Sequence, residues 1–187
     1  EAGEKVALVG PSGCGKSTLA KVILQLMPKG SLCKGDLWLQ SQDPRLLIKE
    51  ELRKMRGETV GLIFQDPMTR LNPLLSAGEH LMDTIKNHYP NSRGSWQHSQ
   101  SLELLKKIGI SPTRFCAYPH ELSGGMRQRL AIAMAIALKP QLLIADEPTT
   151  SLDVVIADQI MTEITSLCNQ LGSSLLLISH DLALAGK

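Results

Sequence analysis

A glycine-rich octapeptide near the start of the chain constrains the fold more than any other feature of the sequence. It occupies residues 10–17 and matches the pattern G-x-x-x-x-G-K-[ST]. An apolar run at residues 6–9 precedes it, and residues 17–27 carry apolar side chains at helical spacing until Pro28 and Gly30. The octapeptide therefore lies between a predicted buried strand and a predicted helix, which is the context that a phosphate-binding loop (P-loop) requires.

The octapeptide also has the residue types that phosphate binding needs. Its glycines let the backbone curl so that several N–H groups point inward, and the following helix presents its positive end to the same anion. We expect Lys16 to reach the β- and γ-phosphates and the Ser17 hydroxyl to bind Mg²⁺. A chance match in a glycine-rich turn would not need this strand and helix, so the motif predicts nucleotide binding.

Strands and helices alternate along the rest of the chain. The further predicted buried strands are residues 59–64, 141–145 and 174–178, and the further predicted helices are residues 124–138 and 154–171. Leu37 and Leu39 alternate with polar neighbours, which predicts a half-buried strand, and the charged stretch 45–56 predicts a solvated helix face. The alternation indicates a parallel α/β fold.

The length of 187 residues fits one domain. We expect an α/β core formed by residues 1–65 and 119–187. The polar, helix-rich stretch 66–118 predicts an inserted helical subdomain, whose last helix continues through residues 123–138. The chain lacks an initiator Met and stops where a new helix begins, so we expect it to be truncated at both ends. No signal peptide is visible.

Charge and aromatic content exclude some classes of partner. Lys and Arg number 20 against 18 Asp and Glu, which gives a net charge of +2, and aromatic residues make up 3%. No nucleic-acid partner is expected on these grounds. The longest apolar run, residues 130–138, is about half of the roughly 20 residues that a membrane-spanning helix needs. Cys14, Cys33, Cys116 and Cys168 form no CxxC pair and are predicted to be small buried residues in a reducing cytosol.

A second motif joins an apolar strand to two acidic residues. Residues 142–148 have the sequence L-L-I-A-D-E-P, so the strand ends at Asp146 and Glu147. In a parallel sheet this end lies beside the P-loop. Asp146 suits Mg²⁺ coordination, and Glu147 is then free to accept a hydrogen bond from an attacking water as a general base. The alternative, a solvated acidic turn, would need no buried strand in front of it.

A third motif, residues 122–129, opens a predicted helix. Ser123 can cap this helix, while Gly124 and Gly125 leave its N-terminus uncovered as a second anion site. The chain already has one P-loop. We therefore expect the second anion site to contact a nucleotide that is bound to another molecule.

Together with Gln65, residues 151–153 and His180, these motifs resemble the ATP-binding subunits of ABC transporters over essentially the whole chain. The resemblance implies a P-loop NTPase (RecA-like) core with a parallel sheet and an inserted α-helical subdomain. It implies that Gln65 touches Mg²⁺ or water and couples the site to a transmembrane partner, and that His180 contacts the γ-phosphate. Residues 123–128 match the signature motif, which closes over the ATP of the opposing subunit. Residues 151–153 match the D-loop, which crosses the dimer interface.

The resemblance and the motifs give a set of candidate site residues for an ATPase that uses ATP and Mg²⁺. The catalytic candidates are Lys16, Gln65, Glu147 and His180. The candidate ATP ligands are Gly10, Pro11, Ser12, Gly13, Cys14, Gly15, Lys16, Ser17, Thr18, Gln65, Ser123, Gly124, Gly125, Gln128, Asp146 and Asp153. The candidate Mg²⁺ ligands are Ser17, Gln65 and Asp146.

A narrower resemblance concerns the importers of oligopeptides, dipeptides and nickel, to which residues 64–73, 118–129 and 146–154 are similar. It implies a bacterial subunit at the cytoplasmic face of the inner membrane. Its partners would be a second ABC ATPase subunit, transmembrane permeases and an external substrate-binding protein. The family's adenine-stacking aromatic residue lies well upstream of the P-loop, outside this chain. The cargo, and the choice between homodimer and heterodimer, stay open.

Two alternatives to the importer have different sequence features. A soluble ABC ATPase of DNA repair, translation or cluster assembly tends to carry long coiled-coil insertions or two tandem cassettes, whereas this chain has one cassette and no heptad run. A P-loop kinase or GTPase would have no use for residues 122–128. Co-purification with membrane proteins would separate the first alternative from the importer, and ATP-dependent dimerisation would separate the second.

Overall fold

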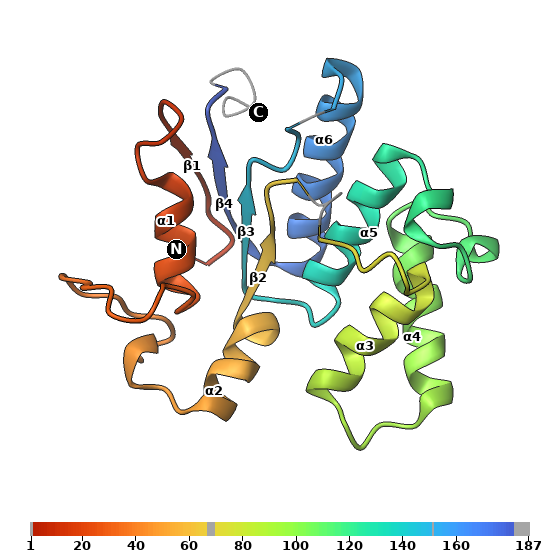
Figure 1. Ribbon diagram of the computed structural model, residues 1–187, viewed down its shortest axis with the longest axis horizontal. Helices are drawn as coiled ribbons and strands as arrows, with labels where there is room; N and C mark the ends of the chain where they lie inside the picture. Colours follow the sequence, from red (N-terminus) through yellow and green to blue (C-terminus); the bar gives the residue numbers. More distant parts are fainter. Residues whose placement is uncertain (1, 67–69, 151, 182–187) are drawn as a thin grey trace.

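Four parallel strands form the sheet of the computed structural model, which describes residues 2–66, 70–150 and 152–181. In the order β1-β4-β3-β2, the strands are β1 (Lys5–Val9), β4 (Ser174–Ser179), β3 (Leu142–Asp146) and β2 (Val60–Ile63). The helices are α1 (Lys16–Ile23), α2 (Lys49–Lys54), α3 (Ala77–His88), α4 (Gly94–Lys107), α5 (Gly124–Ile136) and α6 (Val154–Leu171). Figure 1 shows α1 on one side of the sheet and α5 and α6 on the other.

The central strands β3 and β4 are buried on both faces, because apolar side chains occupy successive positions along them. In β3, Ile144 packs into one apolar cluster with Ala20 and Ile23 of α1. Its neighbour Leu143 points to the opposite face and joins the larger cluster, which includes Ile160 of α6. This two-sided burial confirms the predicted parallel α/β arrangement.

The register of the sheet brings the candidate site together. Parallel pairing places Val9 opposite Ser179, and Asp146 opposite Ile178. The same ladder pairs Ile63 with Ala145. The carboxyl ends of all four strands therefore lie at the same end of the sheet. Four segments leave the sheet there: the P-loop and the segments that begin at residues 64, 147 and 180.

Helices α3 and α4 pack on each other and on α5 through apolar side chains such as Leu81 and Leu105, both of which are fully buried. Ser76 and Glu79 form a capping box at the start of α3: the Ser76 hydroxyl accepts from Glu79 N–H at 3.3 Å, and Glu79 Oε2 accepts from Ser76 N–H at 2.7 Å. The described residues between β2 and α5 thus include two helices, as the composition of this stretch predicted.

The half-buried strand predicted at Leu37 and Leu39 is wrong. Only an isolated antiparallel bridge between Leu39 and Gln42 is present there. Gln40 and Ser41 reverse the chain with left-handed φ angles of 50° and 63°. The alternating pattern therefore reflects a tight turn, which the alternation alone does not distinguish from a strand.

Helix α1 ends at Ile23, before the predicted end at residue 27. The Arg56 guanidinium donates to Leu24 O at 2.8 Å and to Gln25 O at 2.7 Å, and Gln25 has a left-handed φ of 52°. Arg56 lies far along the chain from α1. The residues around the end of the helix therefore do not predict these hydrogen bonds.

Two predictions of burial are also wrong. The first half of β1 is exposed, with Val6 48% accessible, because β1 lies at the edge of the described sheet. Cys14, Cys33 and Cys116 are exposed, and Cys168 of α6 is buried as predicted. The three exposed cysteines lie in irregular segments that do not face either apolar cluster. Among the described helices, none combines the length and the apolar character needed to cross a bilayer.

Candidate active site

The loop after β1 has the backbone conformation of an anion-binding site. Gly13 and Gly15 adopt left-handed φ angles of 82° and 97°, which residues with a Cβ rarely adopt. Gly15 is the N-cap of α1, and this helix has neither a side-chain cap nor an acidic residue in its first turn. The positive end of the α1 dipole is therefore not compensated locally and can accept an anion.

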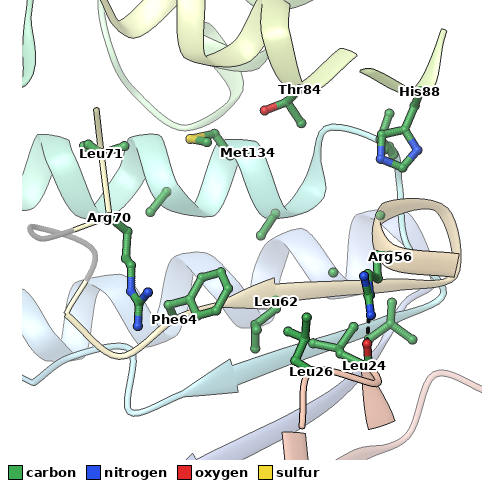
Figure 2. Close-up of a pocket in the computed structure, with 16 residues that line it drawn as sticks. Leu24, Leu26, Arg56, Leu62, Phe64, Arg70, Leu71, Thr84, His88 and Met134 are labelled. Atoms are coloured by element: carbon green, nitrogen blue, oxygen red, sulfur yellow. Dashed lines mark hydrogen bonds between the residues drawn. The ribbon is translucent and has the colours of Figure 1, made fainter. Parts of the chain in front are cut away.

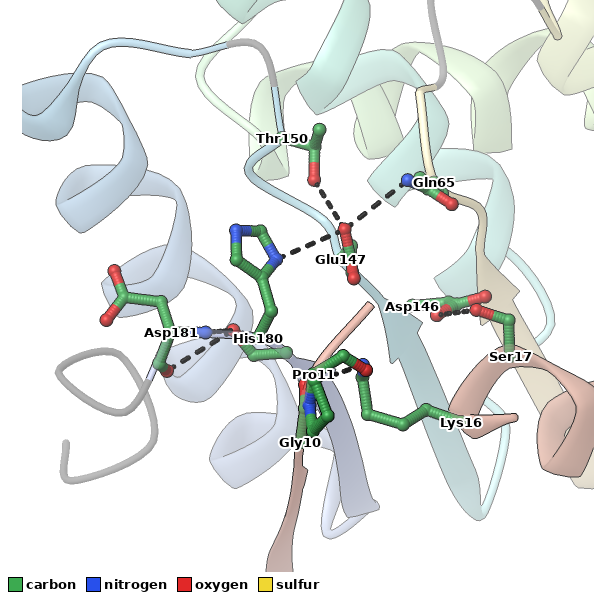
Figure 3. A network of polar contacts seen from close by, with 11 residues as sticks. Gly10, Pro11, Lys16, Ser17, Gln65, Asp146, Glu147, Thr150, His180 and Asp181 are labelled. Carbon is green, nitrogen blue, oxygen red and sulfur yellow. Dashed lines mark hydrogen bonds and ion pairs between the residues drawn. The ribbon is translucent and has the colours of Figure 1, made fainter. Parts of the chain in front are cut away.

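Lys16 lies back against its own loop, as Figure 3 shows. Its ammonium donates to Gly10 O at 2.8 Å and to Pro11 O at 2.9 Å, and the residue is only 7% exposed. The charge is thus held by carbonyl dipoles. Those carbonyls are weaker partners for an ammonium than phosphate oxygens would be.

Asp146 meets the first turn of α1 at the end of β3. The Ser17 hydroxyl donates to Asp146 Oδ1 at 2.9 Å (Figure 3). Burial raises the pKa of the Asp146 carboxyl above its ordinary value; the Ser17 hydrogen bond opposes this, and the charge of Glu147 adds to it. A nearby cation would lower the free-energy cost of burying the charged form of this carboxylate.

The neighbouring oxygens of Ser17 and Asp146 fit Mg²⁺, which prefers oxygen ligands and keeps several waters. Over the ranges that the structure describes, no group of three or more His, Cys, Asp or Glu side chains is arranged to hold a metal. Gln65, the third predicted Mg²⁺ ligand, directs its amide nitrogen to Glu147 Oε2 at 3.3 Å. Its role as a metal ligand stays a prediction.

Glu147 lies at the centre of a polar network from three segments of the chain (Figure 3). Its N–H donates to Ile178 O at 2.9 Å, and its φ is 46°. Its Oε2 accepts from Gln65 Nε2 at 3.3 Å and from the Thr150 hydroxyl at 3.1 Å, and it lies 3.3 Å from His180 Nδ1. The structure thus brings together three of the four predicted catalytic residues.

The predicted signature and D-loop residues lie at two further helix ends. Ser123 caps α5 by accepting from Met126 N–H at 3.3 Å, and Asp153 caps α6 by accepting from Ile156 N–H at 2.9 Å. Both residues are exposed. A Cβ on Gly125 would lie 3.8 Å from Ile156 Cγ2, so the two helix N-termini are neighbours.

Gln128 is placed differently from the rest of the signature segment. It is 2% exposed, and its amide nitrogen donates to Pro148 O in the loop after β3. This contact joins α5 to the Glu147 loop within the chain, so the geometry gives no support to Gln128 as an ATP ligand. Ser151, in the D-loop match, lies outside the described residues.

Sequence reasoning missed Thr150 and the Ile178 carbonyl as contacts of Glu147. The sequence places the Thr150 hydroxyl three residues after Glu147. This spacing predicts a contact only if a turn joins the two residues. The Ile178 carbonyl carries no signal, because its part in the site follows from the pairing of β3 with β4.

Fold and site together define a P-loop nucleotide-binding domain. The chain belongs to the ABC transporter family: the family domain described as ABC transporter matches residues 1–150. The fold is similar to that of the ATP-binding cassette MJ0796, in a dimeric post-hydrolysis state bound to ADP and Pi, with a TM-score of 0.83 and 32% identity. This match covers 99% of this chain and 78% of that one. The predicted fold class is confirmed.

Proteins with similar sequences include transport ATP-binding proteins. The chain is 42% identical to the oligopeptide transport ATP-binding protein OppD of Bacillus subtilis (strain 168), over 99% of this chain and 52% of that protein. It is 44% identical to the dipeptide transport ATP-binding protein DppD of Escherichia coli (strain K12), over 99% of this chain and 57% of that protein. The chain therefore spans about half the length of the curated relatives it matches.

Proposed function

We propose that this chain is the ATP-binding and ATP-hydrolysing part of an ABC importer subunit that energises peptide uptake through partner permeases. One observation carries the proposal: the P-loop, Asp146 and Glu147 converge at one edge of the sheet, with Ser17 hydrogen-bonded to Asp146. Phosphoryl transfer asks a protein mainly for positioning and charge stabilisation, and these groups supply both.

ATP and Mg²⁺ are the proposed ligands of this edge. The curled backbone of residues 10–15 and the N-terminus of α1 would bind the phosphates. The Lys16 ammonium would exchange its two carbonyl partners for phosphate oxygens. Ser17 and Asp146 would hold Mg²⁺, which neutralises phosphate charge when it is bound.

Glu147 is the proposed general base. Its side chain is 12% exposed, so a water could reach its carboxylate. The carboxylate would accept a hydrogen bond from that water and increase its nucleophilicity. Gln65 and His180 contact the same carboxylate, and they are its proposed catalytic partners.

A second ABC ATPase subunit is the proposed partner of the signature segment. Ser123 and Asp153 are exposed at the neighbouring N-termini of α5 and α6, and the hydrogen bonds of their side chains stay within those helices in the part of the chain that the structure describes. The N-terminus of α5 is capped by the neutral Ser123 and has no acidic residue in its first turn, so it favours an anion from outside the chain. We propose that this anion is the ATP held by the second subunit.

The permeases are proposed to dock beside Gln65. A groove of about 420 Å³ opens between the end of α1, β2, α3 and α5 (Figure 2). Apolar side chains such as Leu62 and Met134 line it. Phe64 and Arg70 line it as well, with the Arg70 guanidinium carbon 5.1 Å from the Phe64 ring centre. Phe64 immediately precedes Gln65. A permease segment bound in the groove would therefore contact the loop that, by the family resemblance, couples the ATP site to the transmembrane partner.

The cargo, a further partner, the location and the domain boundaries are also proposed. The names of the relatives favour peptides as the cargo. Transport of nickel stays a prediction, and an external substrate-binding protein is proposed as a further partner. The proposed location is the cytoplasmic face of a bacterial inner membrane. We also propose residues 1–65 and 119–187 as the α/β core and 66–118 as a helical subdomain, because the described strands lie in the former and α3 and α4 in the latter.

Family membership removes the P-loop kinase or GTPase from consideration. The soluble ABC ATPase is tested by co-purification: the importer subunit should be recovered with membrane permeases from detergent extracts. Recovery without any membrane protein under conditions that preserve ATPase activity would favour the soluble alternative.

The two-subunit site is tested with Ser123→Arg in the purified protein. The bulky side chain obstructs the N-terminus of α5, so turnover should be abolished while ATP binding at the P-loop stays near the wild-type value. Ser95→Arg, a matched change at an exposed position in the first turn of α4, should alter neither quantity. If ATP binding and turnover fell together in Ser123→Arg, the signature segment would belong to the chain's own site.

A further inference from the structure

Glu147 begins a tight turn that ends at Thr150. The Glu147 N–H donates to Ile178 O at 2.9 Å, and the Thr150 N–H donates to Glu147 O at 3.2 Å. The φ of Glu147 is 46°, a left-handed value that few residues with a Cβ adopt. The Gln128 amide donates to Pro148 O within the same turn. The backbone of the turn is thus attached to both β4 and α5.

The Thr150 hydroxyl closes this turn onto the Glu147 side chain, as Figure 3 shows. It donates to Oε2 at 3.1 Å, compared with 3.3 Å for Gln65 Nε2 and 3.3 Å for His180 Nδ1. Gln65 and His180 come from the ends of other strands, and the His180 side chain is 57% exposed. Thr150 lies on the same anchored turn as Glu147. Its position relative to the carboxylate is therefore the best defined of the three.

The three partners address one carboxylate oxygen. Within the described residues, Gln65, Thr150 and His180 all contact Oε2, and no hydrogen bond or ion pair involves Oε1. A carboxylate held by one oxygen keeps the other available as an acceptor. The local contact from Thr150 also restricts rotation of the carboxylate.

We propose that Thr150 is a positioning residue for Glu147. Its hydroxyl holds Oε2, so that the carboxylate keeps one orientation and presents Oε1 to the water that it activates. Thr150 acts only through Glu147 and touches no reacting atom. The inference rests on the proposed function, because it takes Glu147 to be the general base.

Removing the hydroxyl should lower kcat with little effect on nucleotide binding. One hydrogen bond to a charged group is lost, for which we expect a decrease in kcat of roughly tenfold. The P-loop does not involve Thr150, so KM for ATP and the affinity for ATP should stay within about twofold of wild type. A role in folding alone would lower the melting temperature without this separation of kcat from KM.

The experiment compares four forms of the purified protein: wild type, Thr150→Val, Thr150→Ser and Thr162→Val. Valine keeps the shape and removes the hydroxyl, whereas serine keeps the hydroxyl. Thr162 is the matched control, because its hydroxyl donates to Asp158 O at 2.9 Å within α6. We expect the kcat loss in Thr150→Val, recovery in Thr150→Ser, and wild-type kinetics in Thr162→Val.

Epistasis gives a second measurement. In a Glu147→Gln background the general base is absent, so Thr150→Val should not reduce the residual turnover further. An additional tenfold loss in that background would place the hydroxyl's effect elsewhere and overturn the proposal. If Thr150→Val does not fold, Thr150→Ala replaces it in both measurements.

Two other results would overturn the proposal alone: wild-type kcat in Thr150→Val, or equal impairment of the Val and Ser variants. A wild-type protein that binds ATP and shows no hydrolysis would instead overturn the proposed function, and this inference with it. The two failures are therefore distinguishable.

Discussion

Asp146 should destabilise the free protein and stabilise the nucleotide-bound one, so its replacement by Asn separates the two effects. The residue is 9% exposed, and burial raises the pKa of its carboxyl. The ionised form of this carboxyl therefore weakens the folded state. Asparagine has nearly the same shape, and its Oδ1 can still accept from the Ser17 hydroxyl. Asp146→Asn thus removes a buried charge and keeps the hydrogen bond.

The sign of the effect follows from the direction of the pKa shift. A carboxyl whose pKa is raised by folding favours the folded state only below its unfolded pKa, and this contribution is lost as the pH rises through the folded pKa. Above the folded pKa the penalty is present in wild type, and Asp146→Asn lacks it at every pH. Lys21 and Lys16 offset part of it. We expect the free energy of unfolding to rise by about 1 kcal/mol, or about 2–4 °C in Tm.

Ligand should reverse the order of the two proteins. A nucleotide at a hundred times its Kd stabilises the folded state by about 2.7 kcal/mol. Asp146→Asn has lost the proposed carboxylate ligand of Mg²⁺, so it should lose most of that increase. With Mg²⁺ and a non-hydrolysable ATP analogue, wild type should therefore melt above Asp146→Asn.

Thermal unfolding without nucleotide and with the analogue measures both effects on each protein. Asp153→Asn is the control, because this exposed residue caps α6 and Asn caps as well as Asp. Its free form should not melt above wild type. An Asp146→Asn protein that melts below wild type without nucleotide, or that keeps the full shift with the analogue, would refute the reasoning.

Two further predictions concern packing and thiol chemistry. In Gly61→Ala the new methyl group would overlap the carbonyl oxygen of Ala135, so we expect a loss near the upper end of about 1–3 kcal/mol in the free energy of unfolding by denaturant titration. Gly94→Ala, with nothing within 4 Å of its Cβ, should lose none, and equal stability of the two variants would contradict the packing. At pH 8 a thiol reagent should modify the exposed Cys14 and spare Cys168, since burial raises the pKa of Cys168 to about 11. Added nucleotide should slow the modification of Cys14, and an unchanged rate would argue against phosphate binding at the loop.

The elements around the site were predictable because each has its own local signal. Helix α6 has the predicted bounds, since Asp153 caps its start and Gly172, with a left-handed φ of 68°, ends it. Strands β2 and β3 lie within one residue of the predicted ranges. Their place in a parallel sheet then puts Asp146 and Glu147 beside the P-loop, as the alternation of strands and helices predicted.

The features that could not be predicted depend on distant partners, on the order of the strands or on a backbone conformation that the sequence does not indicate. The Arg56 side chain donates hydrogen bonds to the backbone carbonyls at the end of α1. The inward orientation of Gln128 depends on its hydrogen bond to the Pro148 carbonyl. The exposure of β1 depends on its position at the edge of the sheet that the described residues form, and the apolar residues of the strand carry no signal for that position. The Thr150 contact requires the left-handed turn at Glu147, a conformation that sequence patterns do not indicate for a glutamate.

The central claim is that this chain hydrolyses ATP with Glu147 as the general base. It is tested most directly by measuring ATP affinity and turnover in wild type, Glu147→Gln and Glu103→Gln, the last being an exposed glutamate on α4. Glutamine has the shape of glutamate without its basicity, so turnover of Glu147→Gln should fall by about 10²–10⁴-fold while ATP affinity stays near wild type. Glu103→Gln should match wild type in both quantities. Near-normal turnover in Glu147→Gln would contradict the account.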